Sequence, residues 1–483
     1  MALVILAGFA VIGAIWLFLS RVPKSYPAAV HPLAPVWAGT PRTNYPAGFD
    51  SPYLGHTGSW DGRGGGMFGS SKINDLDAES RMGLRWTFMA VYWRELEPDG
   101  PVDLTLGVPP AWQELDAFVG EARKRDLNIL LQAPVMGGNA GGPPAWAGRK
   151  TPRRSAPADL GAAAAFAGRL AARYAPGGTL AQREGWGSSY GVRAWEIDNE
   201  PDSYRTHWED QAADYAMFVQ QVSGSIKHAD PLALILAPGI PVSRSSLVWI
   251  NQALAAGSGA SSTGGLRPAM DVVSFHIYEG LDSAFQGKDR DIELAIDELQ
   301  AVFTASAGGE ATGRLPPPRE YWHTEGNFDF LGILSASRRA AWRMQFMTRA
   351  FAAGVSKVCV MDASPPEQIA VRTYVTALPN PFPMRRMSNQ VEVLSGRATA
   401  FYHTDTSDPN AGGVWILWAE AGTGEARVNL PLVNSSVMIQ RVDGTIQTLV
   451  PNQKHLAITL PGDAKMAPPV LLIDRAGGPV PAP

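Results

Sequence analysis

The sequence alternates short apolar runs with stretches of helical length, and this alternation limits the possible folds more than any other feature. The runs of strand length lie at residues 84–91, 127–133, 192–197, 233–236, 270–275, 319–322 and 356–361, and a first strand near residues 51–58 brings the count to eight. The helical stretches include residues 112–125, 160–174, 209–228, 292–304 and 337–353. Repeated strand-then-helix units imply parallel strands joined by right-handed crossovers. Eight such units predict an α/β fold, the (β/α)8 or TIM barrel, over residues 49–395.

The C-terminal part of the chain has a different pattern. Short β-type runs lie at residues 414–418, 426–430, 437–442, 446–449, 455–460 and 470–473, with Gly-, Asp- and Pro-containing turns between them. Several short strands at such regular spacing are typical of a small antiparallel sandwich. We therefore expect a β-sandwich domain over residues 396–483.

The first twenty residues contain no charged side chain, and Arg21 and Lys24 follow them. A helix of this length measures about 30 Å, enough to cross the core of a bilayer. We expect a transmembrane anchor or uncleaved signal over residues 1–21 and a Pro-rich tether over 22–48; a cleaved signal peptide is the alternative. This predicts a single-pass, membrane-anchored protein with an extracytoplasmic body. The positive charges after the span favour the opposite orientation.

Charge and cysteine content exclude several classes of protein. The chain carries 41 Lys and Arg against 45 Asp and Glu, a net charge of −4, without any block of five like charges. A nucleic-acid partner is therefore not expected, since such binders carry a basic stripe. The single cysteine, Cys359, excludes an internal disulfide and a cysteine-based zinc site. We expect neither a metal nor a cofactor.

Functional residues of such barrels gather where the strands end. The run at 192–197 leads into Asn199-Glu200-Pro201, and the run at 319–322 leads into Glu325-Gly326. The run at 270–275 is followed by His276 and Tyr278. Two strands thus bring a carboxylate to the same level of the barrel.

Paired carboxylates are the groups that glycosidic bond cleavage requires. One donates a proton to the leaving oxygen while the other, ionised, attacks the anomeric carbon, and a separation of about 5–5.5 Å gives retention of configuration. Taken singly, a glutamate at a strand end is more often a surface charge, and a lone His276 or Tyr278 more often a packing residue. Together at one end of a barrel they favour a glycosidase.

Three segments carry a family resemblance: residues 195–201, 275–278 and 322–326. The chain resembles clan A of the glycoside hydrolases over about residues 75–475, and family 39, the β-xylosidase and α-L-iduronidase group, is the nearest, with families 5 and 30 as relatives. The resemblance implies that Glu200 is the acid/base and Glu325 the nucleophile. It also implies that Asn199 holds the sugar 2-hydroxyl.

The resemblance further implies that His276 and Tyr278 line the −1 sugar site and that Arg85 orients the nucleophile. The chain departs from the family at strand eight, where a tryptophan often lies under the −1 sugar. Residues 360–365 contain no tryptophan. Another aromatic side chain therefore takes this place, or the ligand differs.

Tryptophan is the side chain that stacks best on sugar rings, because its apolar face is the largest. Of the 15 tryptophans, we expect most to pack in the core. Trp146, within the Gly- and Pro-rich insertion at 137–157, is the preferred sugar platform. Other tryptophans expected near the mouth of the barrel are Trp60, Trp93, Trp186 and Trp208.

The sequence therefore predicts a membrane-tethered retaining glycoside hydrolase that cleaves a β-type bond in an oligosaccharide, polysaccharide or glycoconjugate. Two alternatives stay open. One is a non-catalytic glycan-binding protein on the same scaffold, favoured by the absent strand-eight tryptophan. The other is a glycan-assembly factor that transfers sugar, since transfer uses the same two glutamates as hydrolysis.

Overall fold

The structure is a computed structural model. It describes residues 45–57, 70–136, 142–149, 156–202, 208, 212–256, 266–278, 292–305, 320–326, 334–404, 411–451 and 454–475. All of these residues belong to one compact unit.

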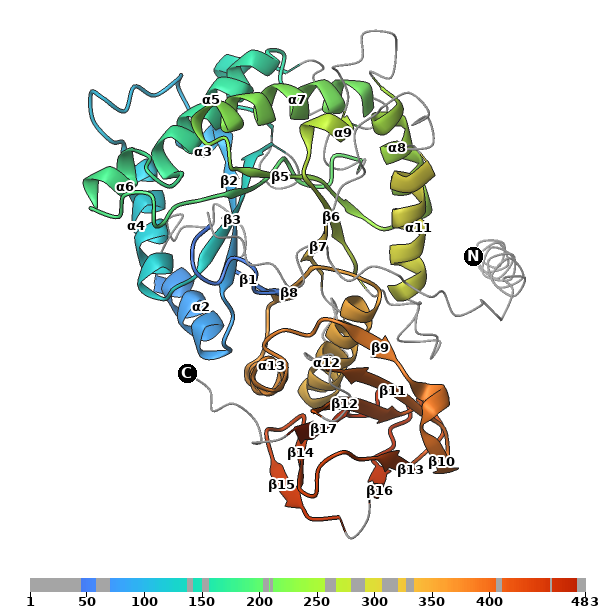
Figure 1. The fold of residues 1–483 in the computed structure, drawn as a ribbon. Helices are drawn as coiled ribbons and strands as arrows, with labels where there is room; N and C mark the ends of the chain where they lie inside the picture. Colours follow the sequence, from blue (N-terminus) through green and yellow to red (C-terminus); the bar gives the residue numbers. More distant parts are fainter. Residues whose placement is uncertain are drawn as a thin grey trace, which may run out of the picture. The chain divides into compact units, whose positions relative to one another are not determined.

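Eight parallel strands form a closed barrel in sequence order, as the sequence predicts (Figure 1). They are β1 Tyr53–His56, β2 Trp86–Tyr92, β3 Asn128–Val135, β4 Ala194–Glu196, β5 Leu234–Pro241, β6 Val272–His276, β7 Glu320–Glu325 and β8 Lys357–Met361. Pairing of β1 with β8, with Leu54 opposite Cys359, closes the ring. Each strand overlaps the residue range that the sequence predicts for it.

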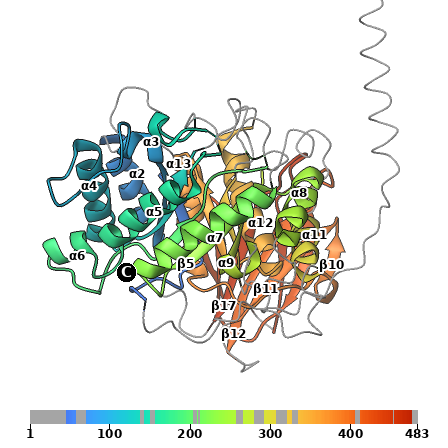
Figure 2. The same ribbon diagram turned by 90° about the horizontal axis from the view of Figure 1, so that it is seen from above.

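Helices surround the barrel, and α5 and α7 run side by side in both views (Figures 1 and 2). The five predicted helices are α4 Pro110–Lys124, α5 Leu160–Tyr174, α7 Ala212–Ala229, α11 Ile292–Ala305 and α12 Ala336–Ala352. The sequence analysis missed α2 Ser70–Arg81, α6 Thr179–Arg183, α8 Arg244–Ala255, α13 Pro365–Ala377 and the short helices α3 Trp93–Leu96 and α9 Leu266–Ala269. The start of α13 has a capping box, in which Ser364 and Glu367 satisfy each other's backbone, and a proline in its first turn.

The interior of the barrel is filled with side chains from alternate strand positions. Leu54, Phe88, Leu130 and Leu236 belong to this inner cluster, whereas the residues between them pack outward against the helices. At the end where the strands begin, the Lys357 ammonium lies 4.5 Å from the Trp86 ring centre and donates to the Phe49 carbonyl at 2.8 Å. A residue that precedes β1 therefore packs at this end of the barrel.

The C-terminal region consists of two antiparallel sheets, as predicted. The larger has the order β15-β14-β17-β12-β11-β9 and the smaller β10-β13-β16. Their strands are β9 Met384–Arg386, β10 Glu392–Ser395, β11 Ala398–His403, β12 Gly412–Ala419, β13 Ala426–Pro431, β14 Val437–Arg441, β15 Ile446–Leu449, β16 His455–Leu460 and β17 Val470–Arg475. The sequence analysis missed β9, β10 and β11, of which β9 and β10 precede the expected boundary at residue 396.

The larger sheet is covered on both faces, which explains the continuous apolar run in β12. Trp415 and Leu417 pack in the cluster shared with the smaller sheet, whereas Val414 and Ile416 belong to the main core that includes the barrel helices. Gln345 of α12 also donates to the Ala467 carbonyl at 2.7 Å. The sheets therefore support α12, which follows the strand that carries Glu325.

The predicted membrane anchoring is corrected. Within the part of the chain that the structure describes, no helix combines the length and the apolar character needed to cross a membrane. The segment predicted as an anchor, residues 1–21, lies outside the described residues, as does most of the predicted tether over 22–48.

An ion pair between two helices holds the end of β8, and its loss tests this packing. The buried Arg343 of α12 pairs with Glu367 of α13 at 2.9 Å and also donates to the Met361 carbonyl. Arg343→Met removes an arginine that pairs with the buried Glu367 carboxylate. We therefore expect the free energy of unfolding to fall by about 3 kcal/mol.

Chemical denaturation followed by circular dichroism measures this change. Arg427→Met, at an exposed position of β13, is the matched control and should change the stability by less than about 0.5 kcal/mol. Equal stability of the two variants would contradict the importance of the buried pair.

Candidate active site

The chain bends sharply after β4, and this bend directs Glu200 toward the mouth of the barrel. Asp198 and Glu200 both have positive φ angles, of 63° and 42°. The Asp198 carboxylate fixes the bend, because it accepts from the Met136 backbone N–H at 3.1 Å and from the Trp208 indole at 2.9 Å. The Glu200 N–H donates to the Gly239 carbonyl at 3.0 Å. Strained backbone held by such contacts is typical of functional sites.

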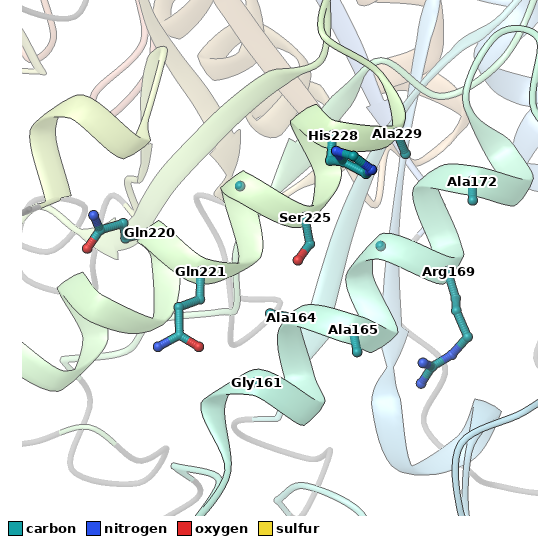
Figure 3. A pocket seen from close by; sticks show the side chains of 12 residues that line it. Gly161, Ala164, Ala165, Arg169, Ala172, Gln220, Gln221, Ser225, His228 and Ala229 are labelled. Carbon is teal, nitrogen blue, oxygen red and sulfur yellow. The ribbon is translucent and has the colours of Figure 1, made fainter. Parts of the chain in front are cut away.

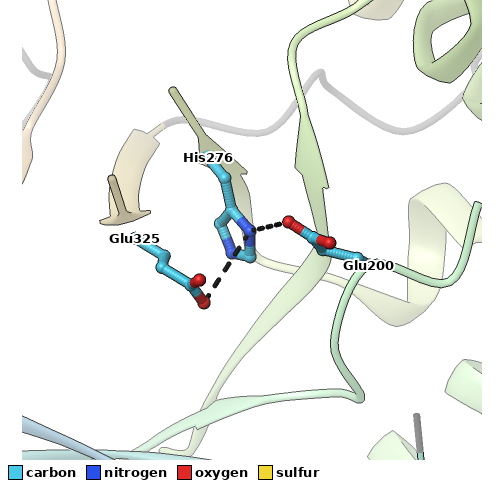
Figure 4. Close-up of side chains that lie close together, drawn as sticks. All are labelled: Glu200, His276 and Glu325. Atoms are coloured by element: carbon cyan, nitrogen blue, oxygen red, sulfur yellow. Dashed lines mark hydrogen bonds and ion pairs between the residues drawn. The ribbon is translucent and has the colours of Figure 1, made fainter. Parts of the chain in front are cut away.

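Glu200 and Glu325 face a common histidine at this mouth (Figure 4). The His276 Nδ1 atom lies 3.0 Å from Glu200 Oε1 and 3.9 Å from Glu325 Oε2. One ligand atom from each of the three residues lies within 4.8 Å of the others. The Tyr278 hydroxyl donates to Glu325 Oε1. The structure thus brings together four of the side chains singled out in the sequence.

Charge and burial set the protonation of this cluster. Burial alone lowers the pKa of His276, but the Glu325 and Glu200 carboxylates outweigh it and raise that pKa to about 9. Burial would raise the pKa of Glu325, yet His276, His56 and the Tyr278 hydroxyl together hold it below the usual value. A protonated imidazole therefore lies beside an ionised Glu325 at neutral pH.

Asn199 forms a second, adjoining network with three residues that were not predicted from the sequence, Gln132, Glu196 and Thr324. Gln132 Nε2, within β3, lies 2.9 Å from Glu196 Oε2 and 3.2 Å from Asn199 Oδ1. Thr324 donates to Glu196 Oε1 at 2.8 Å. Burial raises the pKa of Glu196, and its hydrogen bonds and the nearby His276 oppose this rise. The sequence signal that could have identified Gln132 and Glu196 is a polar residue within a strand of the barrel.

His56, also missed, is at the end of β1, on the same strand face as the interior Leu54. Its ring stacks on Phe88, with the ring centres 4.4 Å apart. Both ring nitrogens are buried, and no described residue hydrogen-bonds to them. A strand-end histidine with free ring nitrogens near Glu325 can bind a polar ligand group.

Arg85 and Trp146 do not join the gathered side chains. Arg85 precedes β2 and lies 4.0 Å from Asp126, which precedes β3, so it is at the opposite end of the barrel from Glu325. The Trp146 ring contacts Trp93 with centres 5.4 Å apart, and its N–H donates to the Glu97 carbonyl at 2.7 Å. Both contacts are with the segment that follows β2.

The remaining tryptophans expected at the mouth also have other roles. Trp93 and Trp208 are fully buried. Trp186 lies in the connection before β4, at the end where strands begin, and packs on Tyr190. Trp60 lies outside the described residues. The sequence identifies tryptophans but not the end of the barrel at which each one lies.

A surface groove between α5 and α7 lies apart from this cluster (Figure 3). Its α5 side consists mainly of glycine and alanine, which lets the helices approach closely, and its α7 side carries Gln220, Gln221, Ser225 and His228. Neither Glu200 nor Glu325 lines it. The groove therefore does not contribute to the candidate site.

The donor set at the mouth is also compatible with a divalent cation. Two carboxylates and an imidazole are common metal ligands, and Glu200, His276 and Glu325 are close enough together to share one ion. A cation would have to displace the proton on His276. Chelation therefore distinguishes a metal site from paired acid catalysis.

The fold is similar to those of several solved glycosidase structures. CelM2, a bifunctional glucanase-xylanase from a metagenome library, is 14% identical, with a TM-score of 0.54 over 83% of this chain and 94% of that chain. A GH39 β-xylosidase from Caulobacter crescentus is 13% identical, with a TM-score of 0.53 over 89% and 96% of the two chains. AbfB, a family 51 α-L-arabinofuranosidase from Bifidobacterium longum, is 14% identical, with a TM-score of 0.52 over 89% and 96%.

No family model and no curated protein sequence matches the chain. At 13–14% identity the likeness to these structures is one of fold. The resemblance to clan A and family 39 that the motifs predict is therefore confirmed at the level of the fold.

The charge on His276 predicts a pH-dependent contribution to stability. Its pKa of about 9 in the folded protein exceeds the unfolded value of about 6.5, so its contribution is complete below pH 6.5 and is lost as the pH rises through 9. We expect the stability advantage of wild type over His276→Asn to shrink by on the order of 3 kcal/mol across this window.

Urea denaturation at several pH values measures this advantage. His455→Asn, at an exposed position of β16, should show the wild-type pH profile. A difference between wild type and His276→Asn that is constant from pH 6.5 to 9 would rule out an elevated pKa for His276.

Proposed function

We propose that this chain is a retaining glycoside hydrolase that uses Glu200 as acid/base and Glu325 as nucleophile on a β-type bond of a carbohydrate. The observation that carries the proposal is the position of the two carboxylates, with oxygens within 4.8 Å of each other at the open end of the barrel. Retaining enzymes need a separation of about 5–5.5 Å, whereas inverting enzymes need about 6.5–9.5 Å for an intervening water.

In the first step the Glu325 carboxylate attacks the anomeric carbon and the bond to the leaving oxygen breaks. Glu200 gives its proton to that oxygen, and a glycosyl ester of Glu325 forms. In the second step Glu200 takes a proton from water, whose oxygen displaces Glu325 from the anomeric carbon. Two inversions give net retention.

His276 and Tyr278 keep Glu325 suited to this role. The positive imidazole favours the ionised form of Glu325, and the Tyr278 hydroxyl holds one of its oxygens. The other oxygen can therefore attack while the carboxylate keeps its orientation. His276 also contacts Glu200 at 3.0 Å, so one side chain fixes the distance between the two glutamates.

Asn199 and His56 are the residues we propose for sugar binding beside the two glutamates. Asn199 adjoins Glu200 and matches the asparagine that holds the 2-hydroxyl in clan A enzymes. His56 offers ring nitrogens on the β1 side of the site.

Glu325→Ala tests the nucleophile. We expect loss of turnover of activated aryl glycosides by several orders of magnitude, because no covalent intermediate can form. Added azide should restore part of the rate and give a product of inverted configuration. Glu425→Ala, at an exposed position, is the control and should keep wild-type activity. Unimpaired hydrolysis by Glu325→Ala would falsify the mechanism.

Glu200→Ala tests the acid/base with a different signature. We expect substrates with poor leaving groups to lose far more rate than aryl glycosides with acidic leaving groups, because the latter need no proton. Rates measured across aryl leaving groups of graded acidity provide this comparison. An equal loss for all of them would argue against proton donation by Glu200.

Three further readouts separate the alternatives. A glycan-binding protein would bind sugars in calorimetry without turning over any aryl glycoside of a β-linked panel. A metal-dependent enzyme would lose activity with EDTA, whereas acid catalysis by the two glutamates would not. Products formed with a sugar acceptor present distinguish transfer from hydrolysis.

A further inference from the structure

We propose that Gln132 is a positioning residue that fixes the side-chain amide of Asn199 with its NH2 group toward the sugar. The inference rests on the proposed function and deepens it, because it says which residue orients the group that recognises the sugar 2-hydroxyl. The observation that supports it is that one amide group makes two hydrogen bonds. Gln132 Nε2 reaches both Glu196 Oε2, at 2.9 Å, and Asn199 Oδ1, at 3.2 Å.

The orientation of Gln132 follows from the residue to which it is anchored. Glu196 is fully buried on β4, and its other oxygen accepts from Thr324 at 2.8 Å. Gln132 donates through Nε2 to Glu196 Oε2, so the end of Gln132 that faces this carboxyl group is the NH2 group. This assignment uses the first of the two amide hydrogens.

The second hydrogen of Gln132 determines the orientation of Asn199. It points to the Asn199 side chain, which must therefore present its oxygen there. The Asn199 NH2 group is then directed elsewhere, as a donor beside Glu200. A flipped Asn199 would bring two NH2 groups together and lose this bond. One buried carboxylate thus fixes two amides in succession.

The same carboxylate links the two strands that carry the glutamates. Thr324 directly precedes Glu325 on β7, and Asn199 directly precedes Glu200 after β4. Gly239 leaves room for this link, since a Cβ atom there would lie 3.2 Å from Glu196 Oε1. Hydrogen bonds across the barrel interior therefore hold the sugar-binding amide in register with both glutamates.

Substrates with and without the 2-hydroxyl test the proposal. The comparison uses an aryl glycoside that wild type hydrolyses and its 2-deoxy analogue, and the readout is the ratio of their kcat/KM values. We expect Gln132→Met to reduce this ratio at least about tenfold, as Asn199→Ala does, because both lose the same oriented donor. The double variant should lose no more than Asn199→Ala alone.

The matched control is Gln345→Met, since Gln345 is also buried and also donates through its amide, at 2.7 Å to the Ala467 carbonyl. It should leave the ratio unchanged. A wild-type ratio in Gln132→Met, or additive losses in the double variant, would overturn the proposal. Gln132→Asn, which keeps an amide but is too short to span both partners, replaces Gln132→Met if the latter does not fold.

A second readout needs no turnover and separates this inference from the proposed function. In protein labelled with 15N-asparagine, the Asn199 side-chain NH2 signals are identified by their loss in Asn199→Ala. We expect Gln132→Met to shift them and Gln345→Met to leave them in place. Unmoved signals in Gln132→Met would overturn the inference, whereas a wild type that hydrolyses no glycoside would contradict only the proposed function.

Discussion

The contact of one imidazole with two carboxylates is the interaction on which the candidate site depends. The positive charge on His276 favours the ionised form of Glu325, whose Oε2 atom lies 3.9 Å from His276 Nδ1. His276 can hold this place because it ends β6, and β7 beside it ends in Glu325. The closed barrel fixes this distance, since neither strand can shift alone.

The sequence predicts most of this fold because the barrel buries its strands on both faces. Continuous apolar runs result, and they locate seven of the eight strands, whereas β1 was expected near residues 51–58 to complete the count. Helix α2 was missed for the complementary reason that much of its surface is polar. In the C-terminal sheets, β10 shows no alternation because all four of its residues are exposed.

The sequence predicts a site residue only where its position relative to the end of a strand is enough to place it at the mouth of the barrel. His276 and Glu325 were found because each ends a strand, and Glu200 because it lies in the bend shortly after β4. Arg85 was misplaced because it precedes its strand and therefore lies at the opposite end. Gln132 and His56 belong to no motif, and although a polar residue inside a strand is a signal for Gln132, the structure is needed to place these side chains beside Asn199 and Phe88.

Covalent trapping is the most direct test of the central claim that Glu200 and Glu325 act on one anomeric carbon. The protein is incubated with an activated 2-deoxy-2-fluoro glycoside of a sugar that it hydrolyses, and its peptides are analysed by mass spectrometry. The account predicts one added glycosyl group on the peptide that contains Glu325, and none in Glu325→Ala. Hydrolysis with a label on another residue, or with inverted product, would contradict it.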